Sequence, residues 1–471
     1  MTDTMSAERP PTDIDVKKTV PWIIFVIFFA VLNETVFNVS IPAIAYQFSL
    51  SASGVSWVMT TFIIFFGIGA VIYGKLSDLI SLRTLIVFGI VVYSFGSALG
   101  FALQSSYPAV IVARAVQGAG ASAIPALITV LVARYIPASE RGRVFGVITS
   151  TVAVAIGVGP AIGGFISGVL HWSLLFAVPL FTLIAIPFFR KILPVEARRP
   201  GTIDVPGALF IAGGIGSLML FLTFGGWYYL AAAVVLLAAF VVDVLVAKEP
   251  FIELGLLRNR DFRRRVYVGF ILFAIVIGSL FVIPLMLSSL RGLSTGQIGL
   301  VLFPGAICSA ALGTFGGSLA DRRGNTFVIT VGLGLLFASF LALAITLSYS
   351  VILVAAALVF MYIGFNFAQT ALFNSVSQTL DDHETGVGMG LFNLTSFVSG
   401  AIGTSLVGRY LEGGWLDFFR NPLVADHRTL PYSNLLVVLA LFVLISGAIY
   451  LSSRRDIPAG PVSGISSADR P

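Results

Sequence analysis

Two charged side chains, Glu34 and Arg114, lie deep inside long apolar stretches of the sequence. Ionised groups are costly in hydrocarbon, so those that occur there tend to face a cavity or a partner and to have a function. Burial favours the neutral form of a carboxyl group, whereas a nearby cation favours the carboxylate. Glu34 could therefore take up and release a proton as its surroundings change. The alternative is a static ion pair between Glu34 and Arg114.

Neutral polar residues accompany these charges. Asn38 follows Glu34 by one helical turn and shares its face, and Asn366 and Gln369 share a face that Phe373 extends. Such groups could hydrogen-bond a small molecule held between helices, or they could bond neighbouring helices. The residues that we expect to contact a substrate are Asn33, Asn38, Gln117, Asn366 and Gln369.

The composition places these residues in a membrane. Of 471 residues, 57% are hydrophobic and 11% are charged, and the mean hydropathy is +0.99, whereas a soluble domain carries about 25% charged residues. Crossing about 30 Å of hydrocarbon takes roughly 20 apolar residues in a helix. Fourteen stretches qualify, over residues 20–46, 55–75, 84–103, 108–133, 144–168, 173–190, 205–224, 227–247, 266–289, 298–319, 327–347, 350–376, 387–408 and 433–452.

The spans group as six, two and six. We therefore predict an all-α membrane protein with two six-helix bundles and two extra central transmembrane helices. The predicted divisions are a tail over 1–19, a first bundle over 20–190, a linker over 191–265 with the two extra helices and a basic connector, a second bundle over 266–453 and a tail over 454–471.

Basic residues are distributed unequally between the two sides. If the chain crosses at every span, the side of the N-terminus holds Lys17, Lys18 and the clusters within 134–143, 190–199 and 258–265, while the other side holds only Arg291, Arg409, Arg420 and Arg428. The positive-inside rule then predicts a multi-pass protein of the cell membrane with both termini in the cytoplasm. Because the charges cluster between apolar runs rather than along one face, they favour a lipid bilayer over nucleic acid as partner. The sequence does not indicate an oligomeric state.

A short sequence occurs twice. GKLSD, from Gly74 to Asp78, follows the second span, and GSLAD, from Gly317 to Asp321, follows the tenth. Two structurally repeated halves are thereby predicted. An Asp at such a junction can accept hydrogen bonds from a helix N-terminus and hold a gate shut, or it can be a simple loop carboxylate or helix cap. We expect the gating residues to be Asp78, Arg83, Asp321 and Arg322.

The repeated sequence resembles the signature loop of the major facilitator superfamily, and the second copy matches it better, because Leu79 and Ser81 depart from it. RAVQGAG, beginning at Arg114, and GVGPAIGG, ending at Gly164, resemble two motifs of drug/proton antiporters in that superfamily. Glycines four apart permit close helix packing, and proline bends a helix. The second motif implies export, and its residues are Gly157, Gly159, Pro160, Gly163 and Gly164.

Four further segments narrow the resemblance: LNETVFNVSIP from Leu32, VARYIP from Val132, HWS from His171 and ETGVGM from Glu384. Over residues 20 to 410 the chain resembles the fourteen-span tetracycline efflux pumps of the K and L type from Gram-positive bacteria. Those pumps exchange a divalent metal complex of tetracycline for protons, and some exchange Na+ or K+. The resemblance implies proton coupling by Glu34 and Arg114. Gly400 stands where those pumps have a glutamate.

The expected function is proton-coupled efflux of a drug by alternating access, with a tetracycline–metal complex ahead of other substrates. The alternatives are a multidrug/proton antiporter for lipophilic or quaternary ammonium cations, and a Na+ or K+/proton antiporter. An enzyme is not expected, because the one cysteine and three histidines form no metal cluster and no P-loop is present. The sequence accordingly predicts no cofactor and no resident metal; the partners are the drug, protons and the lipid bilayer.

Overall fold

Helix α1 (Val16–Gln47) begins at Asp15, whose side chain accepts hydrogen bonds from the backbone N–H groups of Lys17 and Lys18. In hydrocarbon a segment must satisfy its backbone groups internally, so each long apolar run becomes a helix. The computed structural model describes residues 15–136, 138–194, 204–246, 258–347, 349–380, 385–413 and 428–452. These residues include fourteen helical segments long and apolar enough to cross a membrane, which confirms the predicted architecture.

Six spans form the first bundle, and the fourth and sixth of them each consist of two helical pieces. They are α1, α2 (Ala52–Leu79), α3 (Leu82–Ala102), α4 (Tyr107–Ala121) with α5 (Ala123–Tyr135), α6 (Ala138–Val169), and the 3-10 helix η1 (Trp172–Ala185) with α7 (Ile186–Ile192).

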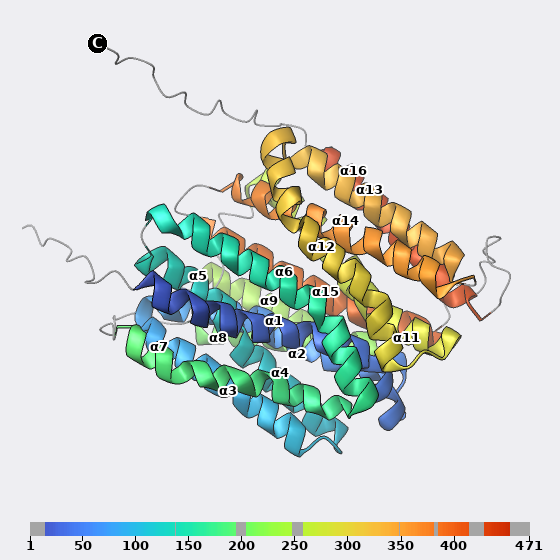
Figure 1. The fold of residues 1–471 in the computed structure, drawn as a ribbon, viewed down its shortest axis with the longest axis horizontal. Coiled ribbons are helices and arrows are strands. Elements are labelled where there is room, and N and C mark those ends of the chain that lie inside the picture. The colour runs from blue at the N-terminus through green and yellow to red at the C-terminus, as the bar shows by residue number, and fades with distance from the viewer. Residues whose placement is uncertain are drawn as a thin grey trace, which may run out of the picture.

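The two extra helices are α8 (Val205–Phe224) and α9 (Trp227–Val246), and the second bundle follows them. It consists of α11 (Arg260–Arg291), α12 (Thr295–Arg323), α13 (Asn325–Thr346), α14 (Val351–Ser377), α15 (Thr385–Gly413) and α16 (Leu430–Leu451). Figure 1 shows this order in colour from blue to red.

Two helices extend into segments predicted as tail or connector. Residues 16–19 belong to α1, and residues 260–265 belong to α11 because Asn259 caps that helix and Phe262 is buried. Both segments carry basic residues, and hydropathy placed the predicted boundaries after these charges. The C-terminal tail and most of the basic connector lie outside the described residues.

The two ends of the bundle differ in how the halves meet. We call the end where α1 begins and α16 ends the tail face, and the opposite end the far face. Near the far face α6 and α12 are in backbone contact: a Cβ built on Gly164 would lie 3.0 Å from the Cα of Gly299. At the tail ends of α2 and α12, a Cβ built on Gly74 or Gly317 would meet nothing within 4 Å. The halves are therefore closed at the far face and diverge toward the tail face (Figure 1).

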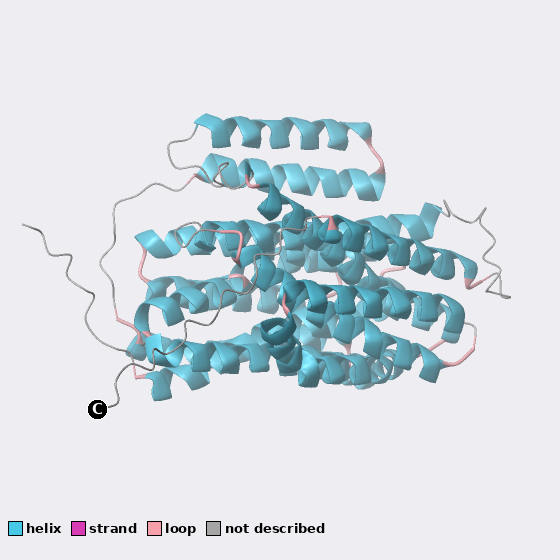
Figure 2. Cartoon of the chain, turned by 90° about the horizontal axis from the view of Figure 1, so that it is seen from above, coloured by secondary structure: helices cyan, strands magenta, loops and turns pink. Residues whose placement is uncertain are grey.

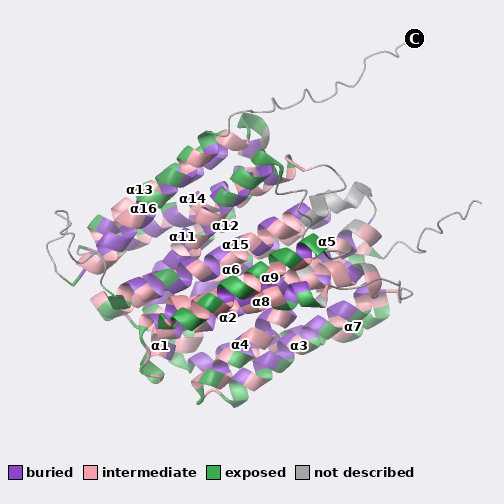
Figure 3. Cartoon of the chain, turned by 180° about the vertical axis from the view of Figure 1, so that it is seen from behind, coloured by how far each residue is buried: buried purple, intermediate pink, exposed green. Residues whose placement is uncertain are grey.

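The extra helices α8 and α9 form a hairpin at the edge of the bundle, visible in Figure 2 as an outlying antiparallel pair. Helix α8 is attached to α15, since the Ser405 hydroxyl donates to the Met219 sulfur at 3.5 Å and Arg409 donates to the Thr223 carbonyl at 3.2 Å. Helix α9 packs on α8, and much of its surface is exposed apolar side chain (Figure 3). The hairpin thus borders the helices that form the seam between the halves without entering the centre.

Glycine contacts on α13 give a matched test of the packing. A Cβ on Gly332 would lie 2.7 Å from the backbone nitrogen of Ala368 on α14, whereas one on Gly334 would meet nothing within 4 Å. We expect Gly332→Val to destabilise the protein by about 1–3 kcal/mol, because the new side chain must separate two backbones. Gly334→Val should leave the thermal unfolding midpoint in detergent unchanged. Equal midpoints for the two variants would contradict this packing.

Candidate functional site

A cavity of about 270 Å³ lies between the halves and is lined by α1, α2, α6, α11, α12, α14 and α15. Glu34 is the one charged side chain among the described residues that line it. Aromatic rings and neutral polar groups form much of the remaining wall. They are Thr35, Asn38, Phe273, Ser309, Tyr362, Phe365, Asn366, Gln369, Phe373, Asn393, Ser396 and Phe397.

Glu34 is partly exposed to the cavity. No described residue offers its carboxyl group a hydrogen bond or an ion pair within 4.0 Å. A carboxyl group in this position is free to exchange a proton or to meet a charged molecule in the cavity.

Glu34 also borders a second cavity of about 110 Å³. This branch lies between α1, α2, α5 and α6, and it extends from Glu34 past Ala30 and Ile27 toward the tail face. Pro125 and Thr129 of α5 are exposed along it. The branch has room for several water molecules, so Glu34 stands where the central cavity and a route toward the tail face meet.

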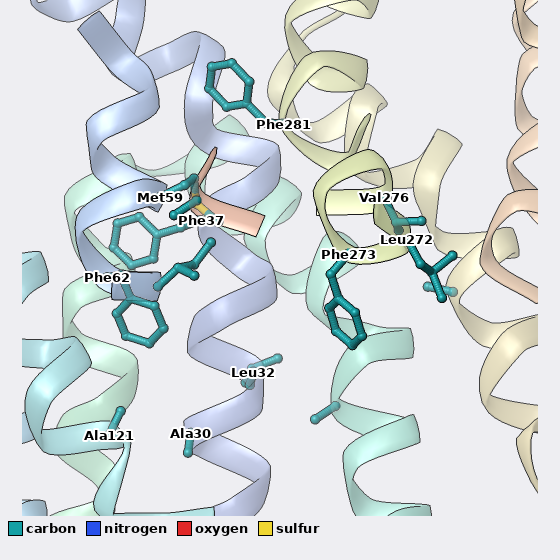
Figure 4. Close-up of a cluster of buried hydrophobic side chains, with 14 of the residues drawn as sticks. Ala30, Leu32, Phe37, Met59, Phe62, Ala121, Leu272, Phe273, Val276 and Phe281 are labelled. Carbon is teal, nitrogen blue, oxygen red and sulfur yellow. The ribbon is translucent and has the colours of Figure 1, made fainter. Parts of the chain in front are cut away.

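Arg114 is fully buried and is held apart from Glu34 by its own partners. Its guanidinium lies between the rings of Phe37 and Phe62, 4.2 and 4.1 Å from their centroids. Figure 4 shows these two rings side by side between α1 and α2. The Arg114 Nε donates to the Val58 carbonyl at 3.0 Å, which fixes the side chain against α2. The structure therefore shows no ion pair within 4.0 Å between Glu34 and Arg114, which was the alternative to proton exchange by Glu34.

Gln117 continues the Arg114 network away from the cavity. Its amide oxygen accepts from Arg114 Nη1 at 3.0 Å, and its amide nitrogen donates to the Ser97 hydroxyl at 2.8 Å. Asn33 and Gln117 are both fully buried and are absent from the cavity lining. Substrate contact by these two residues stays a prediction that this conformation does not support.

Asn38, Asn366 and Gln369 do line the cavity, so the structure brings these three predicted residues together with Glu34 from both halves. The Asn366 amide oxygen is buried and has no hydrogen-bond partner, which leaves it available to a donor. Tyr362 and Phe365 line the same wall but were not among the residues predicted from the sequence. The spacing Tyr362, Phe365, Asn366, Gln369 and Phe373 is that of one helix face and could have revealed them.

The repeated signature lies in the last turns of α2 and α12 and not in the loops, because both helices continue past its aspartates. The side chains of Asp78 and Asp321 are outside the described part of the chain. Arg83 is partly exposed on α3, and Arg322 is exposed at the end of α12. Arg134 of α5 donates to the Ser77 carbonyl at 2.8 Å, linking the fourth span to the first signature. The gating role of the four residues remains a prediction.

The glycine motif on α6 packs against the turn of α1 that follows Glu34. A Cβ on Gly159 would lie 2.0 Å from the Thr35 hydroxyl oxygen, and one on Gly163 would lie 2.5 Å from the Val36 carbonyl oxygen. On its other side, α6 meets α12 through Gly164 and the Pro160 carbonyl. Helix α6 thus connects the backbone next to Glu34 with the opposite half of the molecule. Gly157 lies on the same seam, near Ala306.

The sequence and the structure were compared with those of known proteins, and the matches are membrane transporters. Residues 23–404 match the family described as the Major Facilitator Superfamily. The chain belongs to this superfamily. It is a multi-pass membrane transporter and not an enzyme, in agreement with the fold and with its relatives.

Among its relatives, the multidrug transporter protein MdtP of Bacillus subtilis (strain 168) is 24% identical over 422 residues, covering 87% of this chain and 78% of that protein. The methylenomycin A resistance protein of the same organism is 29% identical over 313 residues, covering 63% and 65%. A solved bacterial homolog of the human lysosomal transporter Spinster, inward-facing and unoccupied, has a TM-score of 0.67 at 15% identity, covering 93% of this chain and 97% of that one. The last likeness supports the fold alone.

Substitutions of Gln117 and Gln369 test whether Gln117 belongs to the buried Arg114 network and Gln369 to the cavity wall. Gln117→Leu should lower stability by about 1–3 kcal/mol, because Arg114 Nη1 loses its buried acceptor, and it should leave the affinity for a bound drug nearly unchanged. Gln369→Leu should weaken the binding of the drug and leave the stability of the protein nearly unchanged. Thermal midpoints and binding of Mg–tetracycline or ethidium in detergent measure both. A loss of drug affinity confined to Gln117→Leu would contradict the assignment.

Proposed function

We propose that this superfamily member exports drugs across the cell membrane in exchange for protons. The observation that carries the proposal is the position of Glu34: it is the one charged group among the described residues of the central cavity, it has no partner there, and it also borders the branch toward the tail face. Drug and proton then compete for one carboxyl group. That competition couples their opposite movements.

The proposed orientation has the tail face in the cytoplasm, because most basic residues of the sequence belong to that side. The conformation described here is then open to the cytoplasm and closed to the outside. In such a state a drug would enter from the cytoplasm, and the proton displaced from Glu34 would leave along the branch past Thr129.

The substrate class that fits this cavity is an amphipathic molecule with a net positive charge. Aromatic rings offer stacking and cation–π contacts, amide groups offer hydrogen bonds, and Glu34 offers a single negative charge. Both a tetracycline–metal complex and a lipophilic organic cation have this chemistry. Among the described residues no group of three or more His, Cys, Asp or Glu side chains is placed to hold a metal. In the proposed tetracycline complex the divalent ion is part of the cargo, chelated by the drug.

Arg114 and α6 complete the proposed cycle. In the proposed cycle the buried Arg114 guanidinium, held by the Val58 carbonyl and Gln117, is the positive charge near which Glu34 releases its proton when the cavity is open to the cytoplasm. Drug or proton at Glu34 changes the contacts of the α1 turn against Gly159 and Gly163, and α6 carries this change to α12. The relatives named for multidrug transport and for antibiotic resistance support a drug as the substrate.

A reconstituted system tests the proposal. The protein is placed in liposomes with an imposed pH gradient, and proton movement is followed after addition of Mg–tetracycline, ethidium, Na+ or K+. We expect a response to the first two additions; a response confined to Na+ or K+ would instead assign cation/proton antiport. Glu34→Gln should reduce the response to that of empty liposomes, because it removes the one carboxyl group among the described residues of the cavity wall. Asp261→Asn, which neutralises a carboxylate in the first turn of α11, is the matched control and should retain it. Full coupling in Glu34→Gln would refute the role of Glu34.

A further inference from the structure

At the far face, the N-terminus of α2 receives a hydrogen bond from the opposite half of the molecule. Glu412, in the last turn of α15, accepts from the backbone nitrogen of Ser53 through Oε1 at 2.9 Å. The first N–H groups of a helix have no partner within the helix and carry partial positive charge, so a carboxylate there is stabilising. Ser51 of the same helix caps a different group, the Gly54 nitrogen. One of the two side-chain caps of α2 is therefore supplied by the other bundle.

The approach of α15 to α2 positions Glu412 for this bond. One turn before Glu412, a Cβ on Gly408 would lie 3.1 Å from the Ala52 carbonyl oxygen and from the Ser53 Cα. Residues four apart share a helix face. The absence of a side chain at Gly408 thus lets the two helices touch, and Glu412 reaches the end of α2 from the same face.

Arg409 holds Glu412 from the opposite side and ties this corner to the extra hairpin. Its guanidinium lies 4.0 Å from the Glu412 carboxylate and donates to the Thr223 carbonyl at the end of α8. Both side chains are partly exposed, at 37% and 27%, so the ion pair itself is weak. Its effect is to orient the carboxylate, while the bond to Ser53 crosses the seam between the halves.

The equivalent helix of the other half is capped differently. Helix α12 occupies the place of α2 in the repeat, and its N-terminus is capped by its own Ser294 and Gln297. Its contact with α6 is made by glycine backbones, Gly164 and Gly168 against Gly296 and Gly299. One seam at the far face is thus closed by glycine packing, and the other includes a charged hydrogen bond between the halves.

We propose that Glu412 is a gating residue of the transport cycle: its bond to the N-terminus of α2 holds the far face closed and must break for the far face to open. This inference rests on the alternating access proposed above. The bond joins groups that belong to different rigid halves, so rocking of the halves separates them. Removing it should shift the resting population toward the state open at the far face.

The test measures the distance between the halves at the far face. Spin labels are placed at Tyr46 on α1 and Ile352 on α14, which are 90% and 79% exposed, in a Cys308→Ser background that removes the one native cysteine. We expect Glu412→Ala to raise the ratio of long to short distances by about threefold or more, as befits loss of a charged hydrogen bond at a helix end. Glu412→Gln, which keeps an acceptor oxygen but not the charge, should shift the ratio less and in the same direction.

Gln297→Ala is the matched control. It removes a side-chain cap from the equivalent helix, but that cap lies within one half, so the distance distribution should match that of the unmodified protein. An unchanged distribution in both Glu412 variants, or an equal opening in Gln297→Ala, would overturn the proposal. The measurement uses neither drug nor proton gradient, so its result is independent of whether the protein exports the drugs proposed above.

Discussion

A carboxyl group inside a membrane must either lose its charge or find a counter-charge. Glu34 has neither a described hydrogen bond nor an ion pair, and the one buried cation nearby, Arg114, is occupied by the Val58 carbonyl, Gln117 and two aromatic rings. The carboxyl group therefore depends on what the cavity contains. A proton neutralises it, and a cationic drug would supply the missing charge. The surrounding helices hold the Glu34 carboxyl group at the wall of the central cavity, where a proton or a drug can reach it.

The backbone contacts explain how a local change at Glu34 could reach the gates. Helix α6 has no room for side chains at Gly159 and Gly163, where it meets α1, or at Gly164, where it meets α12. Close-packed backbones transmit displacement because they cannot compress. Helices α6 and α12 are in close contact near the far face, whereas toward the tail face a Cβ on Gly74 of α2 or Gly317 of α12 would meet nothing within 4 Å. The glycine motif is thus both the joint between the halves and the neighbour of the titratable turn.

Much of the fold could be predicted because hydrophobic thickness sets helix length. The spans, the two-helix insert and the repeat followed from apolar runs and from GKLSD and GSLAD, and Glu34 was recognisable as a charge in a long apolar run. The direction in which a side chain points was harder to predict. Gln117 lies one turn from Arg114 and looked like a cavity residue, yet it points into the first bundle. Nothing in the sequence around Glu412 indicated its role, because only the packing of α15 on α2 brings it to Ser53. Contacts between distant helices depend on tertiary geometry that periodicity does not encode.

The central claim is that drug and proton compete for Glu34. The most direct measurement is proton release when a saturating cationic drug, such as ethidium or Mg–tetracycline, is added to the purified protein in weakly buffered detergent solution. The account predicts that each bound drug releases up to one proton from the unmodified protein at a pH where Glu34 is protonated, and that the Glu34→Gln protein binds drug without releasing any. Drug binding to the unmodified protein with no proton release at any pH, or equal release from Glu34→Gln, would contradict it.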